Sequence, residues 1–374
     1  MEFCIMAPSL CFTRFGGVCS RASAGWNARR QNTSALSRSV MFAGLKIWIL
    51  VAAAAAGPII ESSVASAQNP QPVSVIAFPG TGNWPIRIGQ DKGYFAQAGI
   101  EVTLTPTPNS VFQMTNLIEG RFDIAMTAVD NVIAYMEGQG EVAVSRQPDL
   151  FVFMGGSPSM PALTTIPEVE GYQELKGKAL AVDAVTTGYA FVLFDLLKRN
   201  GLQLSDYKVE PVGGTPARWQ GLRERKYAAA ILTSPFDLIA RSNGFHVMQY
   251  AKDVYGHYEE SVAATRRSWA TTNEQKLIAY IKGYAAAVEW LRDSKNEDEA
   301  ISILRKYFPQ LSPELATATY ANFVGSRGIA AKAQLDIAGV RKVLELRSEY
   351  GRPKKALTDP TRYYDPRYYE AAIR

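Results

Sequence analysis

Short apolar runs alternate with amphipathic segments over most of the chain. A first series of runs predicts strands at residues 73–78, 100–104, 122–127 and 150–154, with a helix that carries apolar positions on one face from residue 110 to 119. A second series predicts strands at 179–182, 209–212 and 228–232, with a helix that begins near Thr186. Alternation of this kind predicts an α/β fold with mostly parallel sheets.

The remainder of the chain is predicted to be helical. Apolar residues with helical spacing follow Asn273, and further helices are expected near residues 297–308, 314–323 and 335–350. The tyrosine-rich tail, which contains Tyr363 and Tyr364, is expected to be a strap on the surface of the lobe that the first series of strands forms. It is not expected to form a site.

One stretch of the first series is repeated in the second. The pattern of residues 117–125, Leu-x-Glu-x-Arg-Phe-x-x-Ala, recurs at residues 222–230 as Leu-x-Glu-x-Lys-Tyr-x-x-Ala. Each copy joins the end of a predicted helix to an apolar strand that finishes in a threonine. Two similar α/β lobes would produce this repeat, and chance similarity is the alternative.

The segment 41–67 resembles a secretory signal peptide. Lys46 precedes an apolar run at residues 47–60, and Ala65-Ser66-Ala67 is a cleavage site of the small-x-small type. The run is shorter than the ~20 apolar residues of a membrane-spanning helix. We therefore expect cleavage before Gln68, with no lipid anchor because no cysteine follows the site.

Residues 1–40 fit neither a signal peptide nor a folded segment. They contain all three cysteines, Cys4, Cys11 and Cys19, and Met41 stands where a signal peptide of ordinary length would begin. We interpret them as an extended or non-native leader that precedes the true start. The alternative is a long signal peptide with an extended basic region.

Removal of residues 1–67 changes the charge of the chain. The formal net charge falls from +5 to +1, with 34 basic and 33 acidic residues. Binding to nucleic acid, which requires a basic surplus, loses its support. The mature chain has no cysteine, and the spacing of His246 and His257 matches no metal site. We therefore expect no metal, no cofactor and no catalytic residue.

Three segments, taken in order, carry a resemblance to a known family. They are Gly93-Tyr94-Phe95 with residues 99–102 behind it, the stretch 119–125, and Leu175-Lys176-Gly177-Lys178. They are similar to the nitrate/sulfonate/taurine and thiamine-pyrimidine class of periplasmic solute-binding proteins, over residues 73–350. The sequence departs from the family at Arg225 and Ala228, where a glycine and an aspartate are usual.

This resemblance implies a two-lobed periplasmic binding protein type II fold, with mostly parallel sheets flanked by helices and two hinge crossovers. Lobe one would comprise residues 73–157 and 259–374, and lobe two residues 158–258. The resemblance further implies a periplasmic monomer, not an enzyme, that delivers a small molecule to the permease and ATPase of an ABC importer. A periplasmic enzyme or a sensor subunit on the same fold is the alternative.

Ligands of open parallel sheets bind beyond the carboxyl ends of the strands, where loops lead into helices. The helix start at residues 186–188 is the strongest candidate, because hydroxyl and N–H groups converge there and Arg218 could face it. A sulfonate, an aromatic carboxylate or a pyrimidine-like molecule would suit such a site. The loops supply these candidates: Thr81, Asn83, Trp84, Thr127, Asp130, Thr186, Thr187, Gly188, Tyr189, Thr215, Arg218 and Ser234.

Several of these residues have an alternative structural role. Trp84 could belong to the core, and Thr127 and Asp130 could cap a helix. Thr187 could be a simple cap, and Arg218 could lie on a solvated helix face.

Overall fold

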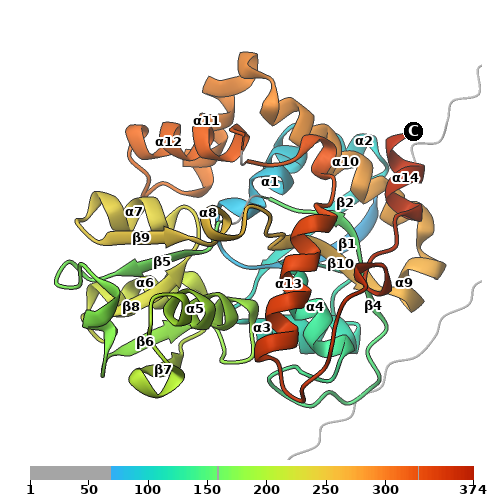
Figure 1. Cartoon of the computed structure of the whole chain (residues 1–374). Helices are drawn as coiled ribbons and strands as arrows, with labels where there is room; N and C mark the ends of the chain where they lie inside the picture. Colours follow the sequence, from blue (N-terminus) through green and yellow to red (C-terminus); the bar gives the residue numbers. More distant parts are fainter. Residues whose placement is uncertain (1–68, 158–159, 327) are drawn as a thin grey trace, which may run out of the picture. The chain divides into compact units, whose positions relative to one another are not determined.

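The computed structural model describes residues 69–157, 160–326 and 328–374. The predicted leader and signal peptide lie outside these residues, so the expectations about residues 1–67 remain predictions. Within the described part, no helix is long and apolar enough to cross a membrane. This part of the chain forms two five-stranded sheets flanked by helices, which confirms the α/β prediction (Figure 1).

The first sheet has the strand order β2-β1-β3-β10-β4. Strands β2, β1 and β3 pair in parallel, whereas β10 runs antiparallel to both of its neighbours, β3 and β4. Its strands are β1 (Gln71–Ala77), β2 (Ile100–Pro106), β3 (Ile124–Ala128), β4 (Leu150–Gly155) and β10 (Ser261–Arg266). The helices between them are α1 (Trp84–Asp91), α2 (Tyr94–Gln97), α3 (Ser110–Glu119) and α4 (Val129–Met136).

The second sheet repeats this arrangement in the order β7-β6-β8-β5-β9. Again three strands are parallel, and an antiparallel strand lies beside the third. Its strands are β5 (Ala162–Thr165), β6 (Ala179–Val182), β7 (Lys208–Pro211), β8 (Ala229–Leu232) and β9 (His246–Tyr250). Its helices are α5 (Gly188–Arg199), α6 (Thr215–Arg223), α7 (Phe236–Ser242) and α8 (Ala251–Tyr255).

The repeated sequence pattern occupies equivalent places in the two sheets. The first copy joins α3 to β3, and the second joins α6 to β8. Both turns contain a left-handed residue, Gly120 with φ of 86° and Arg225 with φ of 58°. The turn is therefore kept although the usual glycine is absent from the second copy.

Helices form most of the remaining chain. Apart from short 3₁₀ segments, they are α9 (Arg267–Thr272), α10 (Glu274–Arg292), α11 (Glu297–Tyr307), α12 (Pro313–Val324), α13 (Ile337–Tyr350) and α14 (Arg367–Ile373). The predicted tyrosine-rich strap does dock on the first sheet, because Val152 of β4 donates its N–H to the carbonyl of Tyr363 at 2.7 Å. The ring of Tyr368 packs 5.7 Å from that of Phe151.

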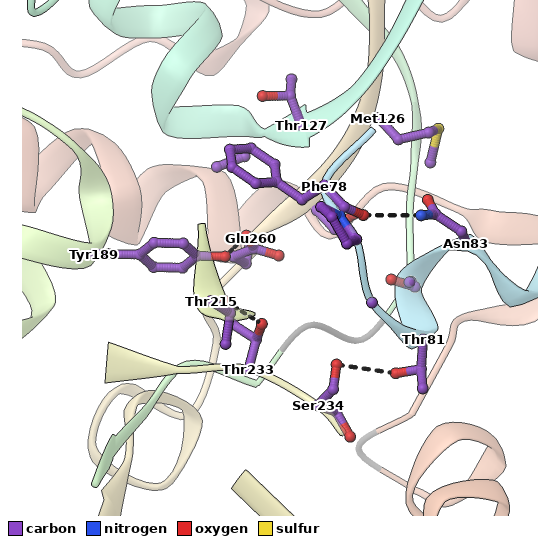
Figure 2. A pocket seen from close by; sticks show the side chains of 16 residues that line it. Phe78, Thr81, Asn83, Met126, Thr127, Tyr189, Thr215, Thr233, Ser234 and Glu260 are labelled. Atoms are coloured by element: carbon purple, nitrogen blue, oxygen red, sulfur yellow. Dashed lines mark hydrogen bonds between the residues drawn. The ribbon is translucent and has the colours of Figure 1, made fainter. Parts of the chain in front are cut away.

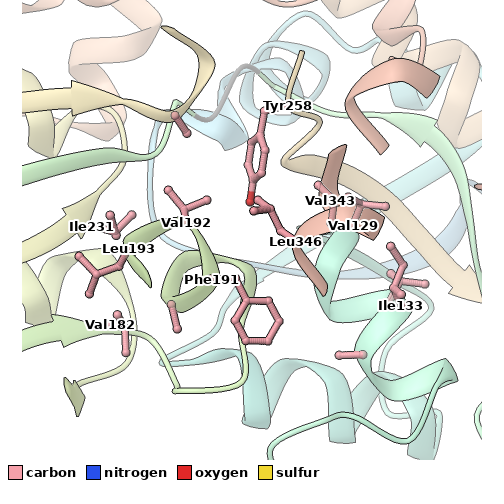
Figure 3. Close-up of a cluster of buried hydrophobic side chains, with 14 of the residues drawn as sticks. Val129, Ile133, Val182, Phe191, Val192, Leu193, Ile231, Tyr258, Val343 and Leu346 are labelled. Atoms are coloured by element: carbon pink, nitrogen blue, oxygen red, sulfur yellow. The ribbon is translucent and has the colours of Figure 1, made fainter. Parts of the chain in front are cut away.

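Helix α13 packs against elements of both sheets. Figure 3 shows its residues Val343 and Leu346 in one apolar cluster with residues of α4 and α5. Arg347, on the same helix, donates to both carboxylate oxygens of Asp130 at 2.7 and 2.5 Å, and to the carbonyl of Thr186 at 2.7 Å. Asp130 follows the first sheet and Thr186 follows β6 of the second, so α13 links the two.

Some boundaries differ from the sequence-based expectation. Strands β5, β9 and β10 were not expected, because they run antiparallel to partners that are distant in the sequence. The pair Thr215-Pro216 is typical of an N-cap followed by the first helical residue, but helix α6 begins at Thr215 with Gly214 as its N-cap, so Pro216 is the second helical residue. The proposed lobe boundaries stay a prediction.

Candidate functional site

A cavity of about 50 Å³ lies where loops of the two sheets meet (Figure 2). The loop after β1 contributes residues 78–83, and the end of β3 contributes residues 126–128. The second sheet contributes Thr215 at the start of α6 and the loop after β8. These are carboxyl ends of parallel strands, the places from which the sequence predicted a site.

Direct contacts join the loops of the two sheets around this cavity. The hydroxyl of Thr81 donates to the carbonyl of Ser234 at 3.1 Å. The N–H of Gly214 donates to the carbonyl of Pro108 at 2.9 Å, near the far end of the same interface. Asn83 turns inward within its own loop and donates to the carbonyl of Phe78 at 2.8 Å. The loops of the two sheets are therefore in contact beside the cavity.

The chemistry of the cavity wall is that of hydroxyl groups and one carboxylate. The phenol of Tyr189 donates to Glu260 at 2.5 Å, and Thr215 is hydrogen-bonded to Thr233 at 3.1 Å. Glu260 is 8% exposed, and its carbonyl accepts from the N–H of Val129, which holds it at the start of β10. Among the described residues, no lysine, arginine or histidine lines this cavity. Its hydroxyl side chains are Thr81, Thr127, Ser157, Tyr189, Thr215, Thr233, Ser234 and Ser261.

A smaller cavity of about 10 Å³ adjoins the first and shares Phe78, Ala128, Tyr189 and Glu260 with it. Asp183 lines it and is 4% exposed. One oxygen of Asp183 accepts from the N–H of Ser110 at 3.3 Å, whereas Oδ1 has no hydrogen-bond partner within the described part of the chain. Burial raises the pKa of Asp183.

The helix start at residues 186–188 already holds a carboxylate of the protein itself. Thr186 donates to Glu141 from its N–H at 3.2 Å and from its hydroxyl at 2.6 Å. The hydroxyl of Thr187 donates to the carbonyl of Ala184 at 2.8 Å. Gly188 lies so close to Asp130 that a Cβ there would come within 2.9 Å of it. The groups that we expected to receive an anionic ligand are therefore engaged internally.

Arg218 is fully buried and lines neither cavity. Its three nitrogens donate to the carbonyls of Ile231 and Gly213 and to the hydroxyl of Thr215, at 2.8, 2.5 and 2.8 Å. The guanidinium lies 5.1 Å from the centroid of the Tyr189 ring. The alternative of a solvated helix-face arginine is wrong, since the carbonyls of the strand and loop draw this side chain inward. Here Arg218 positions two residues of the cavity wall.

The structure places the other candidates in three groups. Trp84 is 1% exposed and packs on Phe323 with ring centroids 5.3 Å apart, so it lies in the core. Asp130 is paired with Arg347 and faces neither cavity. Thr127 accepts from Asn131 at 3.1 Å while it also lines the larger cavity. The candidates that line the larger cavity are Thr81, Asn83, Thr127, Tyr189, Thr215 and Ser234, and Thr187, Gly188 and Tyr189 line the smaller one.

Sequence reasoning missed three residues that line both cavities, Phe78, Ala128 and Glu260. Phe78 is the last residue of the first predicted strand, and its apolar side chain was interpreted as part of the core. Glu260 lies next to the predicted lobe boundary between residues 258 and 259, directly before the apolar run that became β10. A charged residue that enters an apolar run at a predicted hinge was the available signal.

Comparison with known proteins identifies the fold and the family. None of the proteins of curated function matches this sequence. Three solved structures that are similar in fold cover 80–81% of this chain. The periplasmic nitrate-binding protein NrtA from Synechocystis PCC 6803 is 13% identical, with 88% of its chain covered and a TM-score of 0.68.

The alkanesulfonate-binding protein SsuA from Xanthomonas axonopodis pv. citri, bound to MOPS, is 15% identical, with 99% of its chain covered and a TM-score of 0.63. A ligand-binding component of an ABC-type import system from Staphylococcus aureus, with zinc bound, is 14% identical, with 99% covered and a TM-score of 0.65. In the described part of our chain, no group of three or more His, Cys, Asp or Glu side chains is placed to hold a metal.

The model of the NMT1-like family matches residues 66–305, well over half of the sequence. The chain thus belongs to the NMT1-like family and has the periplasmic binding protein fold.

Proposed function

We propose that this protein is a periplasmic solute-binding protein that captures a small polar organic molecule between its two sheets. It then delivers the molecule to the permease and ATPase of an ABC importer. The observation that carries the proposal is the cavity between the sheets, whose wall combines hydroxyl groups from the loops of both sheets. A few fixed polar groups inside an enclosed space are typical of small-molecule sites. Relatives of the same fold are named for nitrate and alkanesulfonate binding.

Capture requires that the loops separate and close again. Two crossovers join the sheets, one between β4 and β5 and the other between α8 and β10. The contacts that have to break on the side of the cavity include those of Thr81 with Ser234, Gly214 with Pro108 and Tyr189 with Glu260. A ligand that prefers the closed state by a few kcal/mol is sufficient to shift such an equilibrium.

The test uses the secreted protein, which we expect to begin at Gln68, to be monomeric and to carry no lipid. Native mass spectrometry of protein from the periplasm should detect a bound small molecule, released unchanged on denaturation. A ligand at 100 times its Kd adds about 2.7 kcal/mol to the free energy of unfolding, so it is also visible as a thermal shift. Sulfonates, aromatic carboxylates and pyrimidine-like compounds, the classes suggested by the sequence, belong in the screen.

Small-angle scattering supplies the second measurement. The radius of gyration should fall when a confirmed ligand is added to ligand-free protein. An unchanged radius at saturation contradicts the closing of two lobes on a ligand. Chemical conversion of the bound molecule would instead support the alternative, an enzyme on the same fold.

A further inference from the structure

The smaller cavity is lined by Asp183, and Oδ1 of this residue has no hydrogen-bond partner among the described residues. We propose that Oδ1 of Asp183 accepts a hydrogen bond from an uncharged N–H or O–H group of the solute, such as that of an amide. Asp183 is thereby a residue that determines specificity. This inference rests on the proposed role of the cavity as a solute site. It differs from the sequence-based expectation of an anionic group at residues 186–188.

The first step is the way in which Asp183 is held. It follows β6 directly and is 4% exposed. Its Oδ2 accepts from the N–H of Ser110, the first residue of α3, at 3.3 Å. This hydrogen bond joins an element of the first sheet to the second and fixes the carboxyl group. Oδ1 is then the atom that still lacks a donor, and a buried acceptor without a donor is unfavourable.

The second step is the counterpart of Asp183 in the first sheet. Strands β1 and β6 are each the middle one of three parallel strands, and Phe78 follows β1 as Asp183 follows β6. Both residues line the smaller cavity, and Phe78 also lines the larger one (Figure 2). A solute in the two cavities therefore meets an aromatic ring from one sheet and a hydrogen-bond acceptor from the other.

The third step is size. The smaller cavity has about 10 Å³, which is close to the 10–15 Å³ that one water-sized group needs. One polar atom of the solute fits beside Asp183, while the remainder would occupy the adjoining cavity of about 50 Å³. A single N–H or O–H group has this size. A sulfonate or carboxylate group, with two or three oxygens, is larger.

The fourth step is charge. Burial raises the pKa of Asp183, and the positive charge of Arg218 opposes this rise. Arg218 thus already supplies a positive charge near the carboxyl group, and what the group lacks is a hydrogen-bond donor. An uncharged N–H or O–H supplies that donor. An anionic group would be repelled by the carboxylate, because the interior screens little.

The experiment compares probes of the same shape that differ in one group. Propionamide and benzamide are paired with 2-butanone and acetophenone, in which a methyl group replaces the NH₂ group, and with propionate and benzoate. Calorimetry on ligand-free protein measures binding. We expect each amide to bind roughly 5- to 150-fold more tightly than its ketone, which leaves Oδ1 without a donor, and no binding of the carboxylates. Equal affinities of amide and ketone overturn the proposal.

Asp183→Asn replaces the acceptor by a donor while it keeps the shape of the side chain. The carbonyl oxygen of the new side chain can still accept from Ser110, which places its NH₂ group where Oδ1 was. An amide probe then has to present its carbonyl, as the ketone does. The preference for the amide should therefore fall to within about threefold. A preference of wild-type size in this variant would overturn the role of Asp183.

The matched control is Asp237→Asn. Asp237 is a buried aspartate of the same sheet, and its Oδ1 likewise has no hydrogen-bond partner in the described part of the chain. It lines neither of the two cavities. Its replacement should leave the preference for the amide within about twofold of the wild type. Equal losses in both variants would indicate a general effect of removing a buried carboxyl group, and would overturn the proposal.

A crystal structure with the copurified solute gives a measurement that needs no variant. An uncharged N–H or O–H of the solute within about 3.2 Å of Oδ1 supports the proposal. A water molecule alone at Oδ1, or a solute without such a group, overturns it, while the proposed solute-binding function stands. If no molecule copurifies and none of the probes binds, the proposed function itself fails.

Discussion

The two sheets have a buried aspartate at an equivalent position, but its carboxyl group has different partners in each. Helix α4 follows the third strand of the first sheet and helix α7 follows the third strand of the second, and each has an aspartate in its first turn. Asp130 is 2% exposed and Asp237 is 0% exposed. Asp130 is paired with Arg347 through both carboxylate oxygens. Asp237 accepts from the phenol of Tyr250 at 2.9 Å, and its Oδ1 has no hydrogen-bond partner among the described residues.

This difference arises from the element that packs on each helix. Helix α13 brings a guanidinium to the first sheet, whereas β9 brings a neutral phenol to the second. Burial consequently raises the pKa of Asp237, which favours its protonated form. The comparison teaches that a buried carboxyl group can be accommodated either by an ion pair or by a rise of its pKa toward the protonated form. Which of the two occurs is decided by residues far away in the sequence.

Removal of the guanidinium should have the largest effect on stability. Arg347→Met leaves Asp130 buried without its counter-ion, which we expect to lower the free energy of unfolding by about 3–5 kcal/mol. Urea denaturation measures this change. The double variant Asp130→Asn with Arg347→Met should recover part of the loss, because no uncompensated charge remains. A double variant as unstable as the single one would contradict this account.

The repeated turn allows alanine to be introduced at the equivalent left-handed position of both sheets. Gly120→Ala places a Cβ on a left-handed residue and within 3.0 Å of the guanidinium of Arg266, so a loss of about 1–2 kcal/mol is expected. Arg225→Ala changes a residue that already has a Cβ in that conformation. It removes an exposed ion pair with Glu168 at 3.1 Å, for which the expected loss is less than about 1 kcal/mol. Urea denaturation of both variants tests the order.

The smallest effect concerns Asp237 and depends on pH. Because its pKa is raised in the folded protein, the unfolded chain releases this proton first as pH increases, and the contribution of Asp237 to stability falls above the ordinary pKa of an aspartate. Asp237→Asn can still accept from Tyr250 but does not titrate. The Tm of the variant should rise relative to the wild type between about pH 4 and pH 7. A constant difference in Tm over this range would show that Asp237 keeps its ordinary pKa.

The sequence predicted the elements whose signal is local. The strands before each loop, the apolar face of α10 and the repeated helix–strand pattern follow from spacing alone. The family resemblance supplied the two-lobed fold. Strand β10 could not be predicted in this way, since the run Ser261–Arg266 lies between two strands that precede it by more than a hundred residues.

The site was predictable to a similar degree. The rule for carboxyl ends of strands located the loops that contain Thr81, Thr127 and Thr215. It could not show that Arg218 would donate its hydrogen bonds to the carbonyls of Gly213 and Ile231. Nor could it show that Glu141 would accept a hydrogen bond from Thr186, before the start of α5. These outcomes depend on contacts between residues that are distant in the sequence. Such contacts produce no periodic pattern from which they could be predicted.

The place of β10 in the first sheet has a consequence for the order in which the molecule assembles. Every strand of the second sheet comes from the continuous stretch Ala162–Tyr250. In the first sheet, β4 is an edge strand whose neighbour is β10, so it cannot join until the chain up to Arg266 has been made. Closing that long loop is slow compared with the local steps of the inserted stretch. The first sheet is therefore completed last, although its first strands are the first to be synthesised. Until β10 pairs with β3, the unpaired edge of β3 can form hydrogen bonds with other chains.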